Sequence, residues 1–216
     1  KEVFEKMEDY KTMNLDVNTF FEMTGMIGSI CNNPEDYASF YHNYRGKRYR
    51  HDQVHNLFGY YMTRSASEAF ERYVPEKRIL LFSRASYIGM HRFGGIWQGD
   101  NASWWSHLKM NVKMMPSLNM CGFLYTGADV GGFGADTTED LVLRWLEFAV
   151  FTPLLRNHSA RGTRRQEVYR FSHVQDFADV IGVRYQILPY IYSEYMKAAL
   201  RNTMMFSPLS FIYGGD

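Results

Sequence analysis

The feature that most constrains the fold is a repeated alternation of short apolar runs and helix-like segments along residues 54–203. Each apolar run has the character of a buried strand, and polar residues follow it directly. Because parallel strands need long crossover connections, usually helices, this alternation predicts a parallel α/β arrangement. The four predicted strands are residues 78–83, 94–98, 120–126 and 150–155.

Apolar residues at helical spacing predict the helices between these strands. Helices are expected over residues 54–73, 103–117 and 174–200. Pro75 ends the first, and Pro189 could interrupt the last. One more helix, capped by Thr137 or Thr138, has an apolar face of Leu141, Val142, Trp145, Leu146 and Phe148.

Four strand–helix units make half of an eightfold barrel, whose working face lies at the carboxyl ends of its strands. A doubly wound sheet that binds a nucleotide would instead need a glycine-rich phosphate loop, and residues 131–134 do not match that pattern. The predicted fold class is therefore α/β, the C-terminal half of a (β/α)8 TIM barrel. Residues 1–53 are expected to form an N-terminal excursion of short helices and loops over a site, and residues 54–203 the barrel portion.

Composition excludes several classes of function. Hydrophobic residues make up 46% of the 216 residues, which indicates a globular core. The net charge of +1 and the lack of a basic stripe argue against nucleic acid or a membrane surface as a partner. No apolar run is long enough to span a bilayer. Cys31 and Cys121 provide neither a disulfide framework nor metal-ligand spacing, so we expect a cytoplasmic protein.

Polar residues at the ends of the predicted strands are candidates for a site. Asp100 follows the run Gly94–Gln98, and Trp97 precedes it closely. A carboxyl group on a barrel rim beside an indole ring can act as a proton donor and acceptor in sugar chemistry. Arg84, which follows another strand, could orient that carboxylate or a substrate hydroxyl through its forked donors.

Asp129 and His158 follow the two remaining strands. They offer an acceptor and a donor for vicinal hydroxyl groups, and Phe133 offers a ring for the apolar face of a sugar. Aromatic residues make up 17% of the chain, which suits stacking on sugars, although an aromatic-rich core would explain this too. No combination of Ser or Cys with His and an acid stands out, and no metal site does.

Each candidate also has a structural interpretation. Asp100 could be a helix N-cap, and Arg84 could be the partner in a structural ion pair. Asp129 could be a turn residue, and His158 a structural histidine. The adjacent Trp104 and Trp105 are more typical of helix packing than of a sugar subsite.

Four motifs resemble those of glycoside hydrolase family 31, closest to its bacterial α-glucosidases. The resemblance covers residues 54–216, with residues 33–56 also similar. The motifs, in the family's order, are Phe82–Ser86 (FSRAS), Trp97–Asn101 (WQGDN), Tyr125–Phe133 (YTGADVGGF) and Arg156–Glu167 (RNHSARGTRRQE).

The resemblance implies a role for each candidate. Asp100 would be the general acid/base of a retaining, exo-acting α-glucosidase that hydrolyses terminal α-linked glucose from oligosaccharides. No metal ion or organic cofactor is implied, and a homo-oligomer is possible. The subsite for the non-reducing sugar would be lined by Arg84, Trp97, Asp129, Phe133 and His158.

The chain departs from the family in one respect. The family's nucleophile is an Asp in a Trp-x-Asp-Met-Asn-Glu stretch at the end of the fourth barrel strand, and no such stretch is present. We therefore expect the chain to begin after the nucleophile and to hold strands five to eight. Residues 204–216 resemble the exit from the barrel into the family's C-terminal β-domain.

Two alternatives remain open from the sequence. The chain could be a catalytically incomplete fragment or homologue that acts as a weak glycan-binding module. It could also belong to an enzyme with another activity of the family, such as an α-xylosidase.

Overall fold

The computed structural model describes Asn18, Phe21, Glu22, Gly25 and residues 34–215. The chain forms two compact units, residues 1–58 and 59–216. The division falls within helix α4 (His51–Tyr73), as does the predicted boundary between residues 53 and 54.

The described part of the first unit contains a short helix and a hairpin. Helix α3 (Pro34–Ser39) has its proline at the first helical position, where the missing N–H is not needed. Strands β1 (Tyr41–Tyr44) and β2 (Lys47–Arg50) pair antiparallel across Arg45 and Gly46, which both have positive φ angles, as a tight hairpin turn requires. The expected excursion of helices and loops thus includes a hairpin. Most of its earlier part, residues 1–33, lies outside the described residues.

The second unit holds parallel strands in sequence order. Strands β3 (Phe82–Ser83), β4 (Gly95–Trp97) and β5 (Thr126–Gly127) form one sheet, and β6 (Asp129–Val130) pairs with β7 (Arg156–Asn157). Because only Ala128 separates β5 from β6, a single run of chain lies between β4 and β7. These neighbours form a continuous part of a parallel barrel wall, as the alternation in the sequence predicts.

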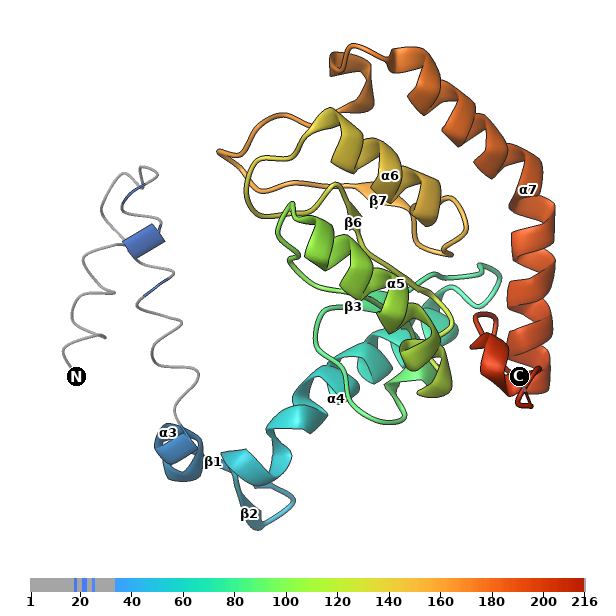
Figure 1. Ribbon diagram of the computed structural model, residues 1–216. Coiled ribbons are helices and arrows are strands. Elements are labelled where there is room, and N and C mark those ends of the chain that lie inside the picture. Colours follow the sequence, from blue (N-terminus) through green and yellow to red (C-terminus); the bar gives the residue numbers. More distant parts are fainter. Residues whose placement is uncertain (1–17, 19–20, 23–24, 26–33, 216) are drawn as a thin grey trace. The chain divides into compact units, whose positions relative to one another are not determined.

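Helices alternate with these strands. Helix α4 precedes β3, α5 (Trp105–Met120) connects β4 to β5, α6 (Glu139–Ala149) connects β6 to β7, and α7 (Val174–Arg201) follows β7 (Figure 1). The predicted helices are confirmed, and α7 continues through Pro189 without interruption. Short 3-10 helices span Met90–Arg92, Val168–Arg170 and Leu209–Phe211.

The main apolar core lies beneath α6. The Thr138 hydroxyl caps this helix by accepting a hydrogen bond from the Leu141 N–H at 3.3 Å. Trp145 is completely buried and lies in one cluster with Val130 of β6 and Phe177 of α7. The predicted face of α6 therefore holds the helix against the strands that carry the candidate site.

The third predicted strand, residues 120–126, begins too early. Helix α5 continues past Pro116 to Met120, and Gly122 turns the chain with a φ of +87°. The Asn119 side chain donates to the Phe123 carbonyl at 3.1 Å and holds this turn. Only Thr126–Gly127 pairs as a strand, because Met120 still belongs to the helix and the chain turns at Cys121 and Gly122 before it reaches the sheet.

The fourth predicted strand, residues 150–155, is wrong. Val150 is the C-cap of α6, and the chain then turns. The Arg184 guanidinium of α7 donates to the carbonyls of Val150, Thr152 and Pro153, at 2.6, 2.8 and 3.2 Å, so a side chain binds groups that a strand ladder would use. Strand pairing begins at Arg156 instead.

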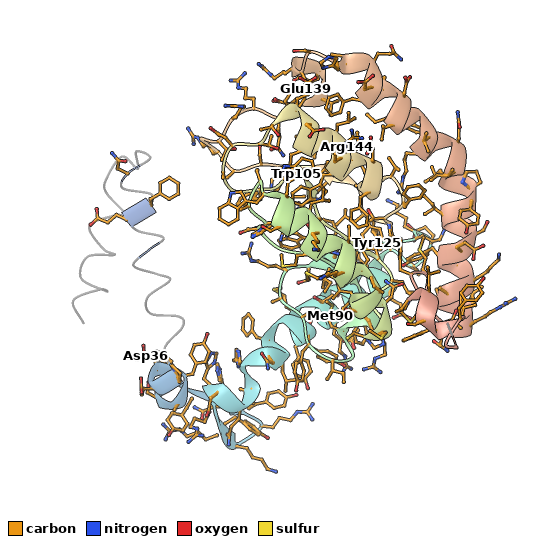
Figure 2. All side chains as sticks on the ribbon, viewed as in Figure 1. Asp36, Met90, Trp105, Tyr125, Glu139 and Arg144 are labelled. Atoms are coloured by element: carbon orange, nitrogen blue, oxygen red, sulfur yellow. The ribbon has the colours of Figure 1, made fainter. Side chains whose placement is uncertain are left out.

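Two further expectations differ from the structure. The strand predicted at residues 78–83 is paired only at Phe82–Ser83, and Leu80 is 58% exposed rather than covered on both faces. Trp104 and Trp105, expected to pack, are 57% and 52% exposed at the N-terminal end of α5, where Figure 2 labels Trp105.

In the part of the chain that the structure describes, no helix combines the length and apolar character that crossing a bilayer requires. Residues 204–215 carry a 3-10 helix, and the start of a β-domain there stays a prediction.

A glycine substitution tests the close approach of the strands. A methyl group on Gly127 would overlap the Leu154 carbonyl oxygen, so Gly127→Ala must displace the chain between β4 and β7. We expect it to destabilise the full-length gene product by about 1–3 kcal/mol, read as a lower apparent melting temperature. The matched control is Gly134→Ala, which has no atom within 4 Å of the new methyl group. Equal melting temperatures for the two variants would contradict the close approach.

Candidate active site

Arg84 and Asp100 form the most accessible part of the site. Arg84 directly follows β3, and Asp100 lies three residues beyond β4, after Gly99 has turned the chain with a φ of +85°. The guanidinium donates to both carboxylate oxygens, at 3.2 and 2.9 Å. This two-pronged bond fixes the plane of the Asp100 carboxyl group, which keeps 37% of its side-chain surface exposed. The structural interpretation of Arg84 was an ion pair. The structure shows such a pair, and its partner is Asp100, the candidate proton donor.

The structure excludes the helix-cap interpretation of Asp100. Helix α5 begins at Trp105, and its N-cap is Trp104, which makes no side-chain capping bond. Asp100 therefore lies outside the helix, in a turn that presents its carboxyl group at the carboxyl end of β4.

Trp97 is contacted by two arginine side chains. The Arg84 guanidinium carbon is 5.6 Å from the indole centre, and that of Arg156 is 5.4 Å from it. Both distances are within the range for attraction between a cation and an aromatic face. The Phe82 ring meets the indole edge-on at 6.2 Å. These contacts place the Trp97 ring next to the Arg84 guanidinium, which binds Asp100.

Asp129 is a fully buried carboxylate. Its Oδ1 atom accepts a hydrogen bond from Arg156 Nε at 2.7 Å, whereas Oδ2 has no hydrogen-bond partner among the described residues. Burial raises the pKa of Asp129, and Asp100 adds to this, while Arg156 and His158 lower it. Its backbone carbonyl also accepts from Gly132 N–H, so Asp129 begins a turn as well as facing Arg156.

Phe133 and His158 form an aromatic pair on neighbouring loops. Their ring centres are 5.3 Å apart, and the planes are inclined by 31°. The Phe133 N–H donates to the Asn101 carbonyl at 2.6 Å, and its own carbonyl accepts from Ala160 N–H at 2.8 Å. The loops after β4, β6 and β7 are thereby fastened to one another around the Phe133 backbone.

The Gln166 side chain connects the loop after β6 to the loop after β7. The side chain is buried, and its amide nitrogen lies within hydrogen-bond distance of four oxygens. These are the carbonyls of Val130 (2.9 Å), Gly132 (3.2 Å) and His158 (3.3 Å) and the Oδ1 of Asn157 (3.0 Å). One amide therefore sets the spacing between the loop that carries Phe133 and the residue His158.

Side-chain contacts join the predicted residues in two groups, one of four residues and the ring pair of Phe133 and His158. Ring contacts and ion pairs connect Arg84, Asp100, Trp97 and Asp129 by way of Arg156, and Asp129 also feels the charges of His158 and Asp100. The assembled site offers one accessible carboxyl group, a buried acceptor and aromatic walls. No group of residues that could hold a metal ion occurs in the described ranges.

Two contributors were missed in the sequence. Arg156 and Asp129 are direct partners in the parallel register of β6 and β7, so opposite charges at matching strand positions would have revealed the pair had the strand been placed at residue 156. Gln166 lies in a polar loop, and nothing in its local sequence marks it as buried.

Parallel strands in barrel order with a carboxylate site at their carboxyl ends define part of a (β/α) barrel. The chain matches the glycosyl hydrolases family 31 TIM-barrel domain over residues 2–194. It therefore belongs to glycoside hydrolase family 31, and the predicted fold class is confirmed.

Relatives and solved structures agree with this assignment. Alpha-glucosidase 2 of Bacillus thermoamyloliquefaciens is 35% identical over 177 residues, covering 81% of this chain and 22% of that protein. Neutral alpha-glucosidase C of Mus musculus is 31% identical over 171 residues, covering 78% and 19%. The solved glucosidase II alpha subunit superposes with a TM-score of 0.71 at 32% identity, covering 76% of this chain and 18% of that one.

The chain spans about a fifth of the length of the curated relatives that it matches. These relatives come from a bacterium and a mammal, so the closer assignment to bacterial α-glucosidases stays a prediction.

Replacing Gln166 tests its hold on the two loops. Gln166→Leu keeps the volume but removes the donor, leaving the buried carbonyls of Val130 and Gly132 without this partner. An unsatisfied buried group costs about 1–3 kcal/mol, so we expect a lower urea midpoint for the full-length gene product. The control Gln175→Leu lies on the exposed face of α7 and should change the midpoint little. If both variants unfold at the same urea concentration, Gln166 does not hold the loops.

Proposed function

We propose that this chain is part of a retaining, exo-acting α-glucosidase, in which Asp100 is the general acid/base. One observation carries the proposal. In a family 31 barrel domain, the accessible Asp100 carboxyl group is held by both donors of Arg84 at the carboxyl end of β4. Active sites of such barrels lie at this end of the strands.

The chemistry needs Asp100 twice. It first gives its proton to the glycosidic oxygen while a second carboxylate attacks the anomeric carbon. It then takes a proton from the water that releases the sugar. The second carboxyl group must lie about 5–5.5 Å away for the configuration to be retained. We propose that an Asp outside these 216 residues supplies it. Arg84 keeps the Asp100 carboxyl plane fixed through both steps.

The other residues are proposed to bind the terminal glucose. The Oδ2 atom of Asp129, buried and without a partner in the described residues, can accept a hydrogen bond from a sugar hydroxyl. His158 can donate to a neighbouring hydroxyl, and Phe133 provides an apolar face beside it. The developing charge resembles an oxocarbenium ion, so these contacts act on hydroxyl groups.

The substrate is proposed to be an oligosaccharide with terminal α-linked glucose. The support is that both relatives are named as α-glucosidases and that the solved glucosidase II alpha subunit is described as bound to alpha3-Glc2. A cytoplasmic location and self-association remain predictions.

Substitution of Asp100 tests the assignment. In the full-length gene product, Asp100→Ala removes the proton donor, so kcat/KM for a disaccharide should fall about 10²–10⁴-fold. The fall should be smaller for an aryl α-glucoside with an acidic phenol, because that leaving group needs little protonation. Added azide should partly restore turnover, since it replaces the water that Asp100 would activate.

The control is Asp176→Asn, an exposed acid on α7, which should leave both rates unchanged. Normal disaccharide turnover by Asp100→Ala would exclude Asp100 as the acid/base. A faster release from aryl α-xylosides than from aryl α-glucosides by the wild type would favour an α-xylosidase, and binding without any turnover would favour a glycan-binding module.

A further inference from the structure

We propose that Arg156 is a positioning residue that holds Asp129 as a fixed carboxylate for the sugar subsite. The inference rests on the proposed function where it predicts changes in activity. Its prediction for the protonation of Asp129 rests on the structure alone. Arg156 itself contacts no reacting atom in this proposal and acts through its partner.

The first argument is geometric. Asp129 and Arg156 are Cα partners on the parallel strands β6 and β7, so the backbone register places the two side chains together. The Arg156 Nε to Asp129 Oδ1 distance is 2.7 Å, and Oδ2 is left without a partner in the described residues. A single bond to one oxygen orients the carboxyl group and leaves the acceptor capacity of its second oxygen unused among the described residues.

The second argument is that Arg156 is itself held in place. Its guanidinium carbon lies 5.7 Å from the Phe82 ring centre and 5.4 Å from that of Trp97. Residues from β3, β4 and β6 therefore contact one guanidinium, and the Arg156 side chain is 31% exposed. A planar, permanently charged group suits this position, because an ammonium ion has no flat face to lie against two rings.

The third argument concerns charge. Asp129 is completely buried, and an unpaired buried carboxylate is strongly disfavoured. The charged and titratable groups that act on it are Arg156 and His158, which favour the carboxylate, and Asp100, which disfavours it; Arg84 also feels its charge. Burial raises the pKa of Asp129 even with Arg156 present. Without Arg156 the carboxyl group would take up a proton at higher pH and would lose its charge.

The test uses the full-length gene product with four variants. Arg156→Met removes the charge, and Arg156→Lys keeps it without the flat fork. Asp129→Asn removes the titrating group, and the double variant Arg156→Met/Asp129→Asn replaces the ion pair by neutral groups and so guards against misfolding of the single variant. The matched control is Arg144→Met, an exposed arginine of α6 that pairs with Glu147.

Two measurements are made across the pH range. The first is the pH profile of kcat and KM for an aryl α-glucoside. The second is the infrared C=O band of a protonated carboxyl group, taken as the difference between Arg156→Met and the double variant. The infrared titration needs no turnover, so it still reports on Asp129 if the proposed glucosidase activity fails.

For Arg156→Met we expect KM to rise more than kcat falls, and the acidic limb of kcat/KM to move up by at least about one pH unit. Arg156→Lys keeps the positive charge, so the acidic limb of kcat/KM should move back towards its wild-type pH. KM should stay raised, because the forked guanidinium is absent. The double variant should lack the shift, and Arg144→Met should match the wild type. The carboxyl band should disappear as the pH rises through the same range.

Two results would overturn the proposal. One is an Arg156→Met enzyme whose kcat/KM falls by the same factor at every pH, which would assign Arg156 a purely structural role. The other is the absence of any carboxyl band that depends on Asp129, which would show that Asp129 stays charged without Arg156.

Discussion

Parallel pairing along residues 126–130 is the constraint on which the site depends. This run of chain pairs with β4 through Thr126 and Gly127 and with β7 through Asp129 and Val130. Because neighbouring parallel strands end at one edge, the loops after β4, β6 and β7 emerge together. Gly127 lies at a close approach of two segments, where no side chain fits against the Leu154 carbonyl. Hydrogen bonds from Phe133 and Gln166 then fix the loops at that edge.

Much of this arrangement could be predicted from the sequence. The helices were found because their apolar faces repeat regularly, as in Leu141, Val142 and Trp145. Four of the six candidate residues, Arg84, Asp100, Asp129 and His158, could be predicted because they follow predicted strands, and the barrel topology gathers strand ends. Trp97 lies within a predicted strand and Phe133 in a loop, and both were predicted from their aromatic rings and motifs. The grouping did not require the strands to be placed accurately, because an error of a few residues leaves a strand's end on the same side of the sheet.

The strand positions themselves could not be obtained in this way. Val150, Thr152 and Leu154 are buried like alternate residues of a strand, but Arg184, far along the chain, binds the carbonyls of Val150 and Thr152. A local pattern records that a residue is buried and does not record which group satisfies its backbone. The same limit hid Arg156 and Gln166, whose roles arise from partners on other segments: Arg156 pairs with Asp129 across two strands, and the Gln166 amide reaches four oxygens.

The position of Trp97 affects both ion pairs of the candidate site. Its indole contacts both Arg84 and Arg156, and each of these arginines holds a different carboxylate. The two ion pairs therefore share one aromatic neighbour. Energies of substitutions within this group are expected not to add, because removing the ring takes a neighbour from both arginines at once. A change to any one of these five side chains is then expected to alter the effect of changes to the others.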